Sequence, residues 1–174
     1  MKLLYAIHHY DTVVFLRFIN MCLYQPLYKL CRWVSKSADG YLYVLIAFGV
    51  VWKDGVSNPF VQALAIAFMV ERPLYFVLKN GLKRDRPQAA LNNVKSFIVP
   101  SDQFSFPSGH TSAAFMMATL CSAFWPSLAV VLYGWSISVG FSRVLLGVHF
   151  PSDVVIGAAM GTGIAYLSLY RVVL

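Results

Sequence analysis

The sequence FVQALAIAFMVERPLYFVL, residues 60–78, is apolar along its 19 positions except at Gln62, Glu71 and Arg72. A helix of about 20 apolar residues is long enough to cross the roughly 30 Å hydrocarbon core of a bilayer. The stretch starts directly after a proline, a favourable first residue of a helix, and it ends at the basic residue Lys79. These features predict a membrane-spanning helix over Phe60–Leu78.

The composition of the whole chain agrees with a membrane protein. Of its 174 residues, 59% are hydrophobic and 12% are charged, about half the charged share of an ordinary soluble domain. A chain this apolar could not cover its own surface with polar groups, which excludes a disordered chain, a nucleic-acid-binding arm and an ordinary cytosolic enzyme. We expect one integral membrane domain over residues 1–174.

Four other stretches are candidates for spanning helices. Gly109–Trp125, Ser127–Leu146 and Pro151–Tyr170 are long, apolar and bounded by Pro, Gly or charged residues, so each predicts a further span. Tyr41–Trp52 is apolar over 12 residues, or about 18 Å of helix, and must recruit flanking residues to cross.

The segment Thr12–Trp33 has two interpretations. Arg17, Asn20, Gln25 and Lys29 recur at helical spacing and leave apolar side chains on the other face. This pattern favours a helix in the membrane interface, although a crossing helix with its polar stripe turned to the bundle fits nearly as well. The expected fold is therefore an all-α, polytopic membrane bundle of five to six transmembrane helices, the first of them interfacial in one interpretation.

The positive charge of the chain is concentrated directly after the expected span Phe60–Leu78. The formal net charge is +7, and four bases fall within eight residues: Lys79, Lys83, Arg84 and Arg86. Such a local run indicates an anionic partner, for which a phosphate or a lipid headgroup is the natural candidate. Since successive spans alternate in direction, the loop 79–108 and the turn 147–150 should lie on the same side of the membrane. Polar clusters that are distant in sequence then converge, as an active site requires.

Three polar clusters are expected on that side: Lys79 with Arg86-Pro87, then Pro107-Ser108-Gly109-His110, then Ser142-Arg143 with His149 and Asp153. In their order and spacing they match the three-part motif of the type 2 phosphatidic acid phosphatase superfamily. The chain resembles this family over Lys79–Asp153 by motif and over Phe60–Tyr170 by helix order. The resemblance implies a membrane enzyme that removes a phosphomonoester or diphosphate group from a lipid.

The residues support the same chemistry on physical grounds. Phosphoryl transfer requires fixed cations and amide donors around three equatorial oxygens. Lys79, Arg86 and Arg143 supply the cations, and the free N–H groups of the helix that starts at Ser108-Gly109 can hold phosphate oxygens. Ser108 either adds its hydroxyl or caps the helix.

The two histidines take different roles. Asp153 could accept a hydrogen bond from one ring nitrogen of His149, which would leave the other nitrogen free to attack phosphorus. By resemblance, His149 is the nucleophile that becomes a phosphohistidine. His110 is similarly identified as the general acid for the leaving oxygen and then the base that activates water.

Each cluster also has a structural interpretation. The Lys79–Arg86 run could anchor a loop at anionic lipid, Arg143 could extend to the interface, and His149 and Asp153 could form a plain structural bond. His110, His149 and Asp153 are possible metal ligands, but a site with three cations repels a divalent ion. We expect metal-independent activity without a cofactor.

Two features of the spanning helices predict packing. Neighbours on a helix face different directions, so Glu71 is expected to pair with Arg17 or another base and not with Arg72. Gly157 and Gly161 favour close helix packing within the chain over a dimer, and we expect a monomer or a weak homodimer.

The resemblance leaves the lipid open. Undecaprenyl diphosphate is our first expectation, because the short chain resembles the bacterial branch; phosphatidylglycerophosphate, phosphatidic acid and lipid A phosphates are alternatives. A lipid phosphotransferase would use the same residues, and a non-enzymatic anion-binding membrane protein is the remaining class. Lys and Arg outside the motifs are level on the two sides, so an outward-facing site in a bacterial inner membrane rests on resemblance.

Overall fold

The structure is a computed structural model that describes residues 2–19, 24–92, 94–100 and 102–173. All regular elements in these ranges are helical: α1 (Lys2–Ile19), α2 (Tyr24–Lys36), α3 (Tyr41–Asp54), α4 (Pro59–Leu82), α5 (Pro87–Ala90), α6 (Gly109–Phe124), the 3-10 turn η1 (Pro126–Leu128), α7 (Ala129–Leu145) and α8 (Pro151–Val173). The expected all-α fold is confirmed.

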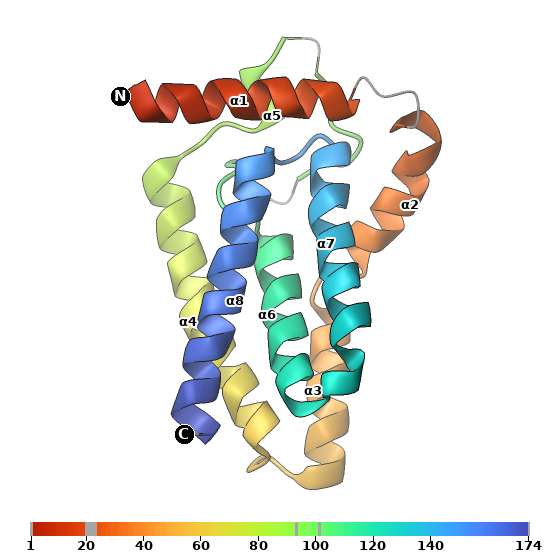
Figure 1. Cartoon of the computed structure of the whole chain (residues 1–174), viewed down its shortest axis with the longest axis vertical. Coiled ribbons are helices and arrows are strands. Elements are labelled where there is room, and N and C mark those ends of the chain that lie inside the picture. The colour runs from red at the N-terminus through yellow and green to blue at the C-terminus, as the bar shows by residue number, and fades with distance from the viewer. Residues whose placement is uncertain (1, 20–23, 93, 101, 174) are drawn as a thin grey trace.

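Helix α6 lies at the centre of an upright bundle with α4, α7 and α8 around it (Figure 1). Ten of its 16 residues are buried, so α6 faces protein more than lipid. Helix α8 approaches it closely, because a Cβ atom on Gly161 would collide with the carbonyl oxygen of Ser112 in α6. The expected packing through this glycine within the chain is confirmed.

Four helical segments among the described residues are long and apolar enough to cross a membrane: Tyr28–Asp54, Pro59–Ala90, Pro126–Leu145 and Pro151–Val172. They contain or overlap the expected spans at Phe60–Leu78, Ser127–Leu146 and Pro151–Tyr170. The expected span Gly109–Trp125 is not among them, because its helix α6 has 16 residues. The short run Tyr41–Trp52 lies in the segment Tyr28–Asp54, which comprises part of α2, a turn and α3. The protein is a multi-pass membrane protein.

The segment Thr12–Trp33 does not form one helix. Helix α1 ends at Ile19 and α2 begins at Tyr24, and α1 lies across the end of the bundle while α3, α4 and α6–α8 run along it (Figure 1). The interfacial interpretation therefore fits α1. Asn20 of the polar stripe lies outside the described residues. Helix α1 buries Phe15 against Phe150, with ring centroids 5.5 Å apart.

The expected partner of Glu71 was wrong. Glu71 is fully buried and pairs with its neighbour Arg72, whose guanidinium also lies 4.9 Å from the centroid of the Tyr75 ring. The second oxygen of Glu71 accepts a hydrogen bond of 2.8 Å from Ser112 of α6. The carboxylate therefore ties α4 to α6 inside the bundle.

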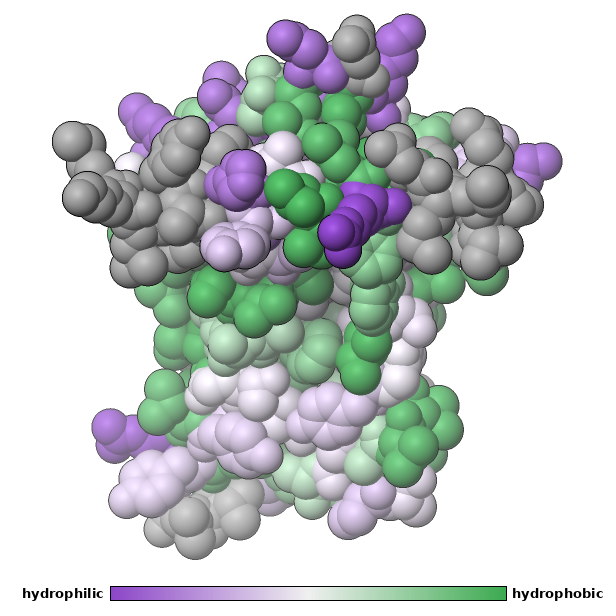
Figure 2. All heavy atoms as spheres, turned by 45° about the horizontal axis from the view of Figure 1, so that its top comes forward, coloured by the Kyte–Doolittle hydropathy of each residue, from purple (hydrophilic) through white to green (hydrophobic). Residues whose placement is uncertain are grey.

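Hydrophilic residues gather at the end of the bundle that α1 covers (Figure 2). Hydrophobic and weakly polar residues cover most of the stem below it in the same view. This division separates a polar head from an apolar body, as a membrane requires. The loops that carry the three motif clusters all belong to the polar head.

Candidate active site

Backbone hydrogen bonds join the three motif segments at the polar head. The Ser105 N–H donates to the carbonyl of Arg84 at 2.8 Å, which joins the segment after α4 to the one before α6. The Ser108 N–H donates to the carbonyl of Asp153 at 3.0 Å, which joins the start of α6 to the start of α8. The convergence expected from alternating spans is present in the structure.

Lys79 and Arg86 share one carboxylate, that of Asp102. The Nζ atom of Lys79 lies 2.9 Å from Oδ1 of Asp102, and Nη2 of Arg86 lies 2.6 Å from the same oxygen. Tyr75 donates to the other oxygen at 2.9 Å. Burial raises the pKa of Asp102, but the bonds from Lys79, Tyr75 and Arg86 outweigh burial and lower the pKa to about 2. Asp102 is thus a fixed negative charge among the expected phosphate-binding cations.

Arg143 of α7 has an unused donor. Its Nη1 donates to Oγ of Ser35 in α2 at 2.6 Å. Its Nε is buried and has no hydrogen-bond partner among the described residues. A buried guanidinium donor without a partner costs free energy unless an acceptor binds there. Since Arg143 lines the cavity described below, this donor can serve an incoming oxyanion.

His149 lies in the turn between α7 and α8 and is buried. Its Nδ1 is 3.7 Å from Oδ2 of Asp153 and makes no hydrogen bond, so the expected hydrogen bond is not formed. The reason lies in the other partners of Asp153: the Phe150 N–H holds Oδ2 at 2.8 Å, and Nη1 of Arg84 holds Oδ1 at 2.7 Å. Burial lowers the pKa of His149 to about 3, so the ring is neutral at neutral pH and keeps a lone pair.

Ser108, Gly109 and His110 stand at the start of α6, beside the start of α8. The hydroxyl of Ser108 bonds to that of Thr111 at 2.9 Å and forms no side-chain cap, so the expected cap is absent, while the use of this hydroxyl for a phosphate stays a prediction. A Cβ atom on Gly109 would lie 2.8 Å from Cε2 of Tyr75, which explains the glycine. His110 bonds through Nε2 to Oδ1 of Asp39 at 2.8 Å.

These groups meet at a cavity of about 1250 Å³. Its polar end is lined by Arg86, Asp102, Gly109, His110, Arg143 and His149. Its other arm runs between α3 and α4 and is largely apolar, with Tyr43, Val44, Ala47, Val61, Leu64 and Phe68. The shape suits an amphipathic molecule with an anionic head. Lys79 and Ser108 lie behind this lining, in contact with lining residues.

The described residues contain no group of three or more His, Cys, Asp or Glu side chains placed to hold a metal ion. His110 is bonded to Asp39, while Asp153 is bonded to Arg84 and the backbone of Phe150. The expectation of metal-independent activity stays a prediction for experiment.

Several residues of the site were not predicted. Asp102 contacts both Lys79 and Arg86. Asp39 bonds to His110, and Ser35 bonds to Arg143. Asp102 lies in a loop, and Asp39 and Ser35 lie in the first third of the chain. Tyr75 carried a usable signal, because it precedes Lys79 by four residues and therefore shares its face of α4.

Comparison with known proteins gives a consistent picture. A family model described as the PAP2 superfamily matches residues 58–173. The bacitracin transport permease protein BcrC of Bacillus licheniformis is 30% identical over 125 residues, covering 70% of this chain and 62% of that protein. The undecaprenyl-diphosphatase of Sulfolobus acidocaldarius is 27% identical over 166 residues, covering 91% of this chain and 77% of that protein.

The crystal structure of Aquifex aeolicus LpxE superimposes on this chain with a TM-score of 0.78 at 28% identity, covering 90% of this chain and 93% of that one. The similarity therefore extends over nearly the whole of that solved chain. By contrast, the chain spans less than two thirds of the length of the Bacillus licheniformis relative.

Proposed function

Because this chain belongs to the PAP2 superfamily, we propose that it is a membrane lipid phosphatase that hydrolyses a phosphomonoester or diphosphate of a lipid. One observation carries the proposal: the motif residues His110, Arg143 and His149 line one end of a cavity whose other arm is apolar. A lipid phosphate would place its head at the histidines and its tail between α3 and α4. A soluble phosphate ester would leave the apolar arm empty.

The proposed reaction has two steps. The neutral ring of His149 attacks phosphorus and forms a phosphohistidine, while His110 gives a proton to the leaving oxygen. His110 then takes a proton from water, which attacks the phosphohistidine and releases phosphate. Arg143 and Arg86, with the N–H group of Gly109, stabilise the charge on the equatorial oxygens, and Lys79 adds its positive charge from outside the cavity lining. No step uses a metal ion or other cofactor.

Undecaprenyl diphosphate is the first candidate substrate, supported by the relative of that activity that covers most of the chain. Phosphatidylglycerophosphate, phosphatidic acid and lipid A phosphates are the alternatives and belong in the same assay. We further propose that the chain is a single domain, a monomer or weak homodimer, and that its site faces outward from a bacterial inner membrane.

The test is phosphate release by detergent-purified protein in excess chelator across a panel of these lipids, with His149→Ala beside the wild type. Release by the wild type alone supports the metal-independent histidine mechanism, and the best lipid names the substrate. Restoration of lost activity by one particular metal would contradict the mechanism. Release that requires an added lipid acceptor would assign the chain as a phosphotransferase, and binding of lipid phosphates without turnover would favour the non-enzymatic class.

A further inference from the structure

The basic run 79–86 divides into two groups in the structure. Lys79 and Arg86 contact Asp102 beside the cavity, whereas Arg84 contacts Asp11 of α1 and Asp153 of α8. Arg84 is not among the described residues that line the cavity. Both of its terminal nitrogens are already bonded to carboxylates. Arg84 is therefore not placed to bind the phosphate of a substrate.

We propose that Arg84 is a positioning residue for the His149–Asp153 pair and that Asp11 holds Arg84 in place, so that docking of α1 is part of building the active site. This inference rests on the proposed function, because it assigns Arg84 to the reaction of His149.

The contact between Arg84 and Asp153 fixes the orientation of a fully buried carboxylate. Nη1 of Arg84 donates to Oδ1 at 2.7 Å, and the Phe150 N–H donates to Oδ2 at 2.8 Å. With both oxygens held, Oδ2 faces Nδ1 of His149 at 3.7 Å. The guanidinium also lies 4.3 Å from the centroid of the Phe150 ring, which restrains it from a second direction.

Helix α1 holds Arg84 through Asp11. This carboxylate is buried although α1 lies across the surface of the bundle. Its Oδ2 accepts from Nη2 of Arg84 at 2.6 Å, and its Oδ1 accepts from the backbone N–H of Ser152 at 2.9 Å. Ser152 is the second residue of α8, so Asp11 satisfies a free N–H at the start of that helix from another part of the chain. One side chain of α1 thus binds both Arg84 and the helix that carries Asp153.

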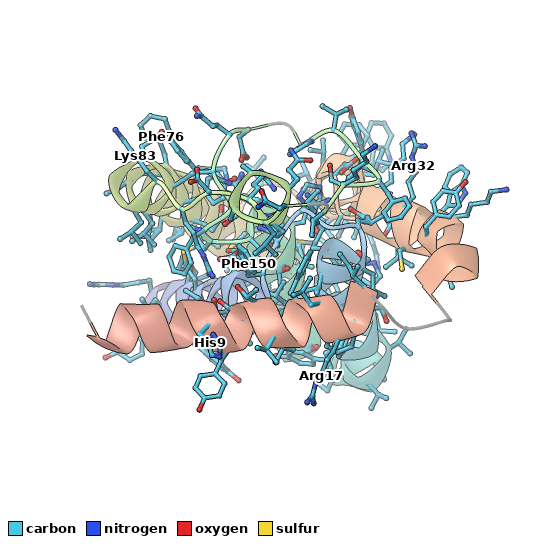
Figure 3. The ribbon with its side chains drawn as sticks, turned by 90° about the horizontal axis from the view of Figure 1, so that it is seen from above. His9, Arg17, Arg32, Phe76, Lys83 and Phe150 are labelled. Carbon is cyan, nitrogen blue, oxygen red and sulfur yellow. The ribbon has the colours of Figure 1, made fainter. Side chains whose placement is uncertain are left out.

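The two sides of helix α1 differ: one carries Asp11 and Phe15 and faces the bundle, and the other faces away from it. Figure 3 shows His9 and Arg17 pointing away from the bundle, while Phe150 lies on the side of α1 toward the bundle. Asp11 and Phe15, four residues apart, occupy that inner side and are both buried. The inner face of α1 therefore serves the catalytic end of α8.

The physical consequence concerns the charge that forms on His149. When the ring attacks phosphorus it becomes positive, and Asp153 must already face Nδ1 to stabilise it. Without Arg84, two buried carboxylates, Asp11 and Asp153, would lose their shared cation, and only the N–H groups of Ser152 and Phe150 would offset their desolvation. Asp153 would then be held at Oδ2 alone, and its orientation toward His149 would no longer be fixed. The cavity lining would be unchanged, so the loss should fall on kcat and not on KM.

The test measures kcat and KM for the lipid that the wild type hydrolyses best, using Arg84→Gln, Arg84→Lys and Asp11→Asn. We expect Arg84→Gln to lower kcat about 10- to 100-fold, the range typical of residues that orient a catalytic side chain, with KM within about threefold. Arg84→Lys should recover part of the loss, because it keeps the charge. The double variant Asp11→Asn with Arg84→Gln should be no slower than Arg84→Gln alone, since both changes act on one contact.

Lys83→Gln is the matched control, because it removes the same charge from the exposed neighbour of Arg84; Arg17→Gln controls for a lost charge on α1. Wild-type kcat in Arg84→Gln would overturn the inference, as would losses in the double variant that multiply. An equal fall in kcat for Lys83→Gln would also overturn it, since the effect would then be one of general charge. If the wild type released phosphate from none of the lipids, both the proposed function and this inference would fail. This outcome differs from the others because the wild type itself would be inactive.

Discussion

Nδ1 of His149 lies 3.7 Å from Oδ2 of Asp153, a gap wider than a hydrogen bond between two groups that are both buried. Catalytic hydrogen bonds are often long before substrate binds and shorten when charge develops. Nδ1 of His149 has no partner among the described residues, so the carboxylate of Asp153 is the nearest acceptor for its proton in the proposed reaction. Turnover is therefore expected to depend on the charge of Asp153 as well as on His149.

Asp153→Asn tests this relationship. The amide keeps the size of the side chain but loses the negative charge that stabilises the positive ring in the transition state. We expect kcat to fall about 100-fold or more, as for other groups that assist proton transfer or a charged histidine. Initial rates of phosphate release measure the effect. A rate within about twofold of the wild type would show that His149 reacts without this carboxylate.

Asp102→Asn should strengthen the binding of inorganic phosphate. The carboxylate occupies Lys79 and Arg86 at 2.9 and 2.6 Å, so it competes with an oxyanion for the same cations. Removing one charge from a partly exposed ion pair changes the free energy of binding by about 1 kcal/mol, or the affinity by about fivefold. The inhibition constant of phosphate should fall by that factor. Asp54→Asn, the same change on the exposed end of α3, is the control, and weaker inhibition in Asp102→Asn would mean that Asp102 organises the cations for phosphate.

Gly109→Ala should damage activity more than folding. The new methyl group would lie 2.8 Å from the ring of Tyr75, which must shift and disturb its bond to Asp102. We expect phosphate release to fall about tenfold, on the order of the cost of one misplaced transition-state donor, with a melting temperature near that of the wild type. Gly163→Ala, where no atom lies within 4 Å of the added carbon, should leave the rate unchanged. Equal rates in both variants would contradict the role given to this close contact.

The buried His149 should make the protein sensitive to acid. Its pKa is lowered from 6.5 to about 3 in the folded state, so below pH 6.5 the unfolded chain binds a proton that the folded chain does not. Stability therefore falls as the pH drops from 6.5 toward 3. The carboxylate of Asp102, whose pKa falls from 3.8 to about 2 on folding, affects stability mainly below pH 4 and therefore not at pH 4.5. Melting temperatures at pH 7 and pH 4.5 should differ more for the wild type than for His149→Gln, and equal differences would contradict the burial argument.

The sequence alone predicted the site residues that lie at the ends of membrane-spanning helices. Lys79, His110 and His149 stand at or near the ends of apolar runs, and alternation of spans is enough to bring such residues to one side of a membrane. The order and spacing of the motifs were then sufficient to identify the family.

Other parts of the site could not be predicted from the sequence. Asp102 lies in a loop without periodicity, and Arg84 meets Asp11 across 73 residues of sequence, a contact that no local pattern encodes. The partner of Glu71 was wrong because helical spacing describes where Cβ atoms point, whereas a long arginine can bend back to its neighbour. The missing His149–Asp153 bond also depends on distant contacts, since Arg84 and the Phe150 N–H hold the carboxylate facing Nδ1 of His149 but 3.7 Å from it.

In the proposed reaction, phosphate passes through a covalent bond to His149. This step is tested most directly by mixing the purified protein, in excess chelator, with a lipid substrate labelled in its terminal phosphate and quenching the reaction within a turnover. We predict a labelled protein that is stable to base and labile to acid, with the label on His149 and absent from His149→Gln. Release of labelled phosphate by His149→Gln at the wild-type rate, or a label on any other residue, would contradict the claim.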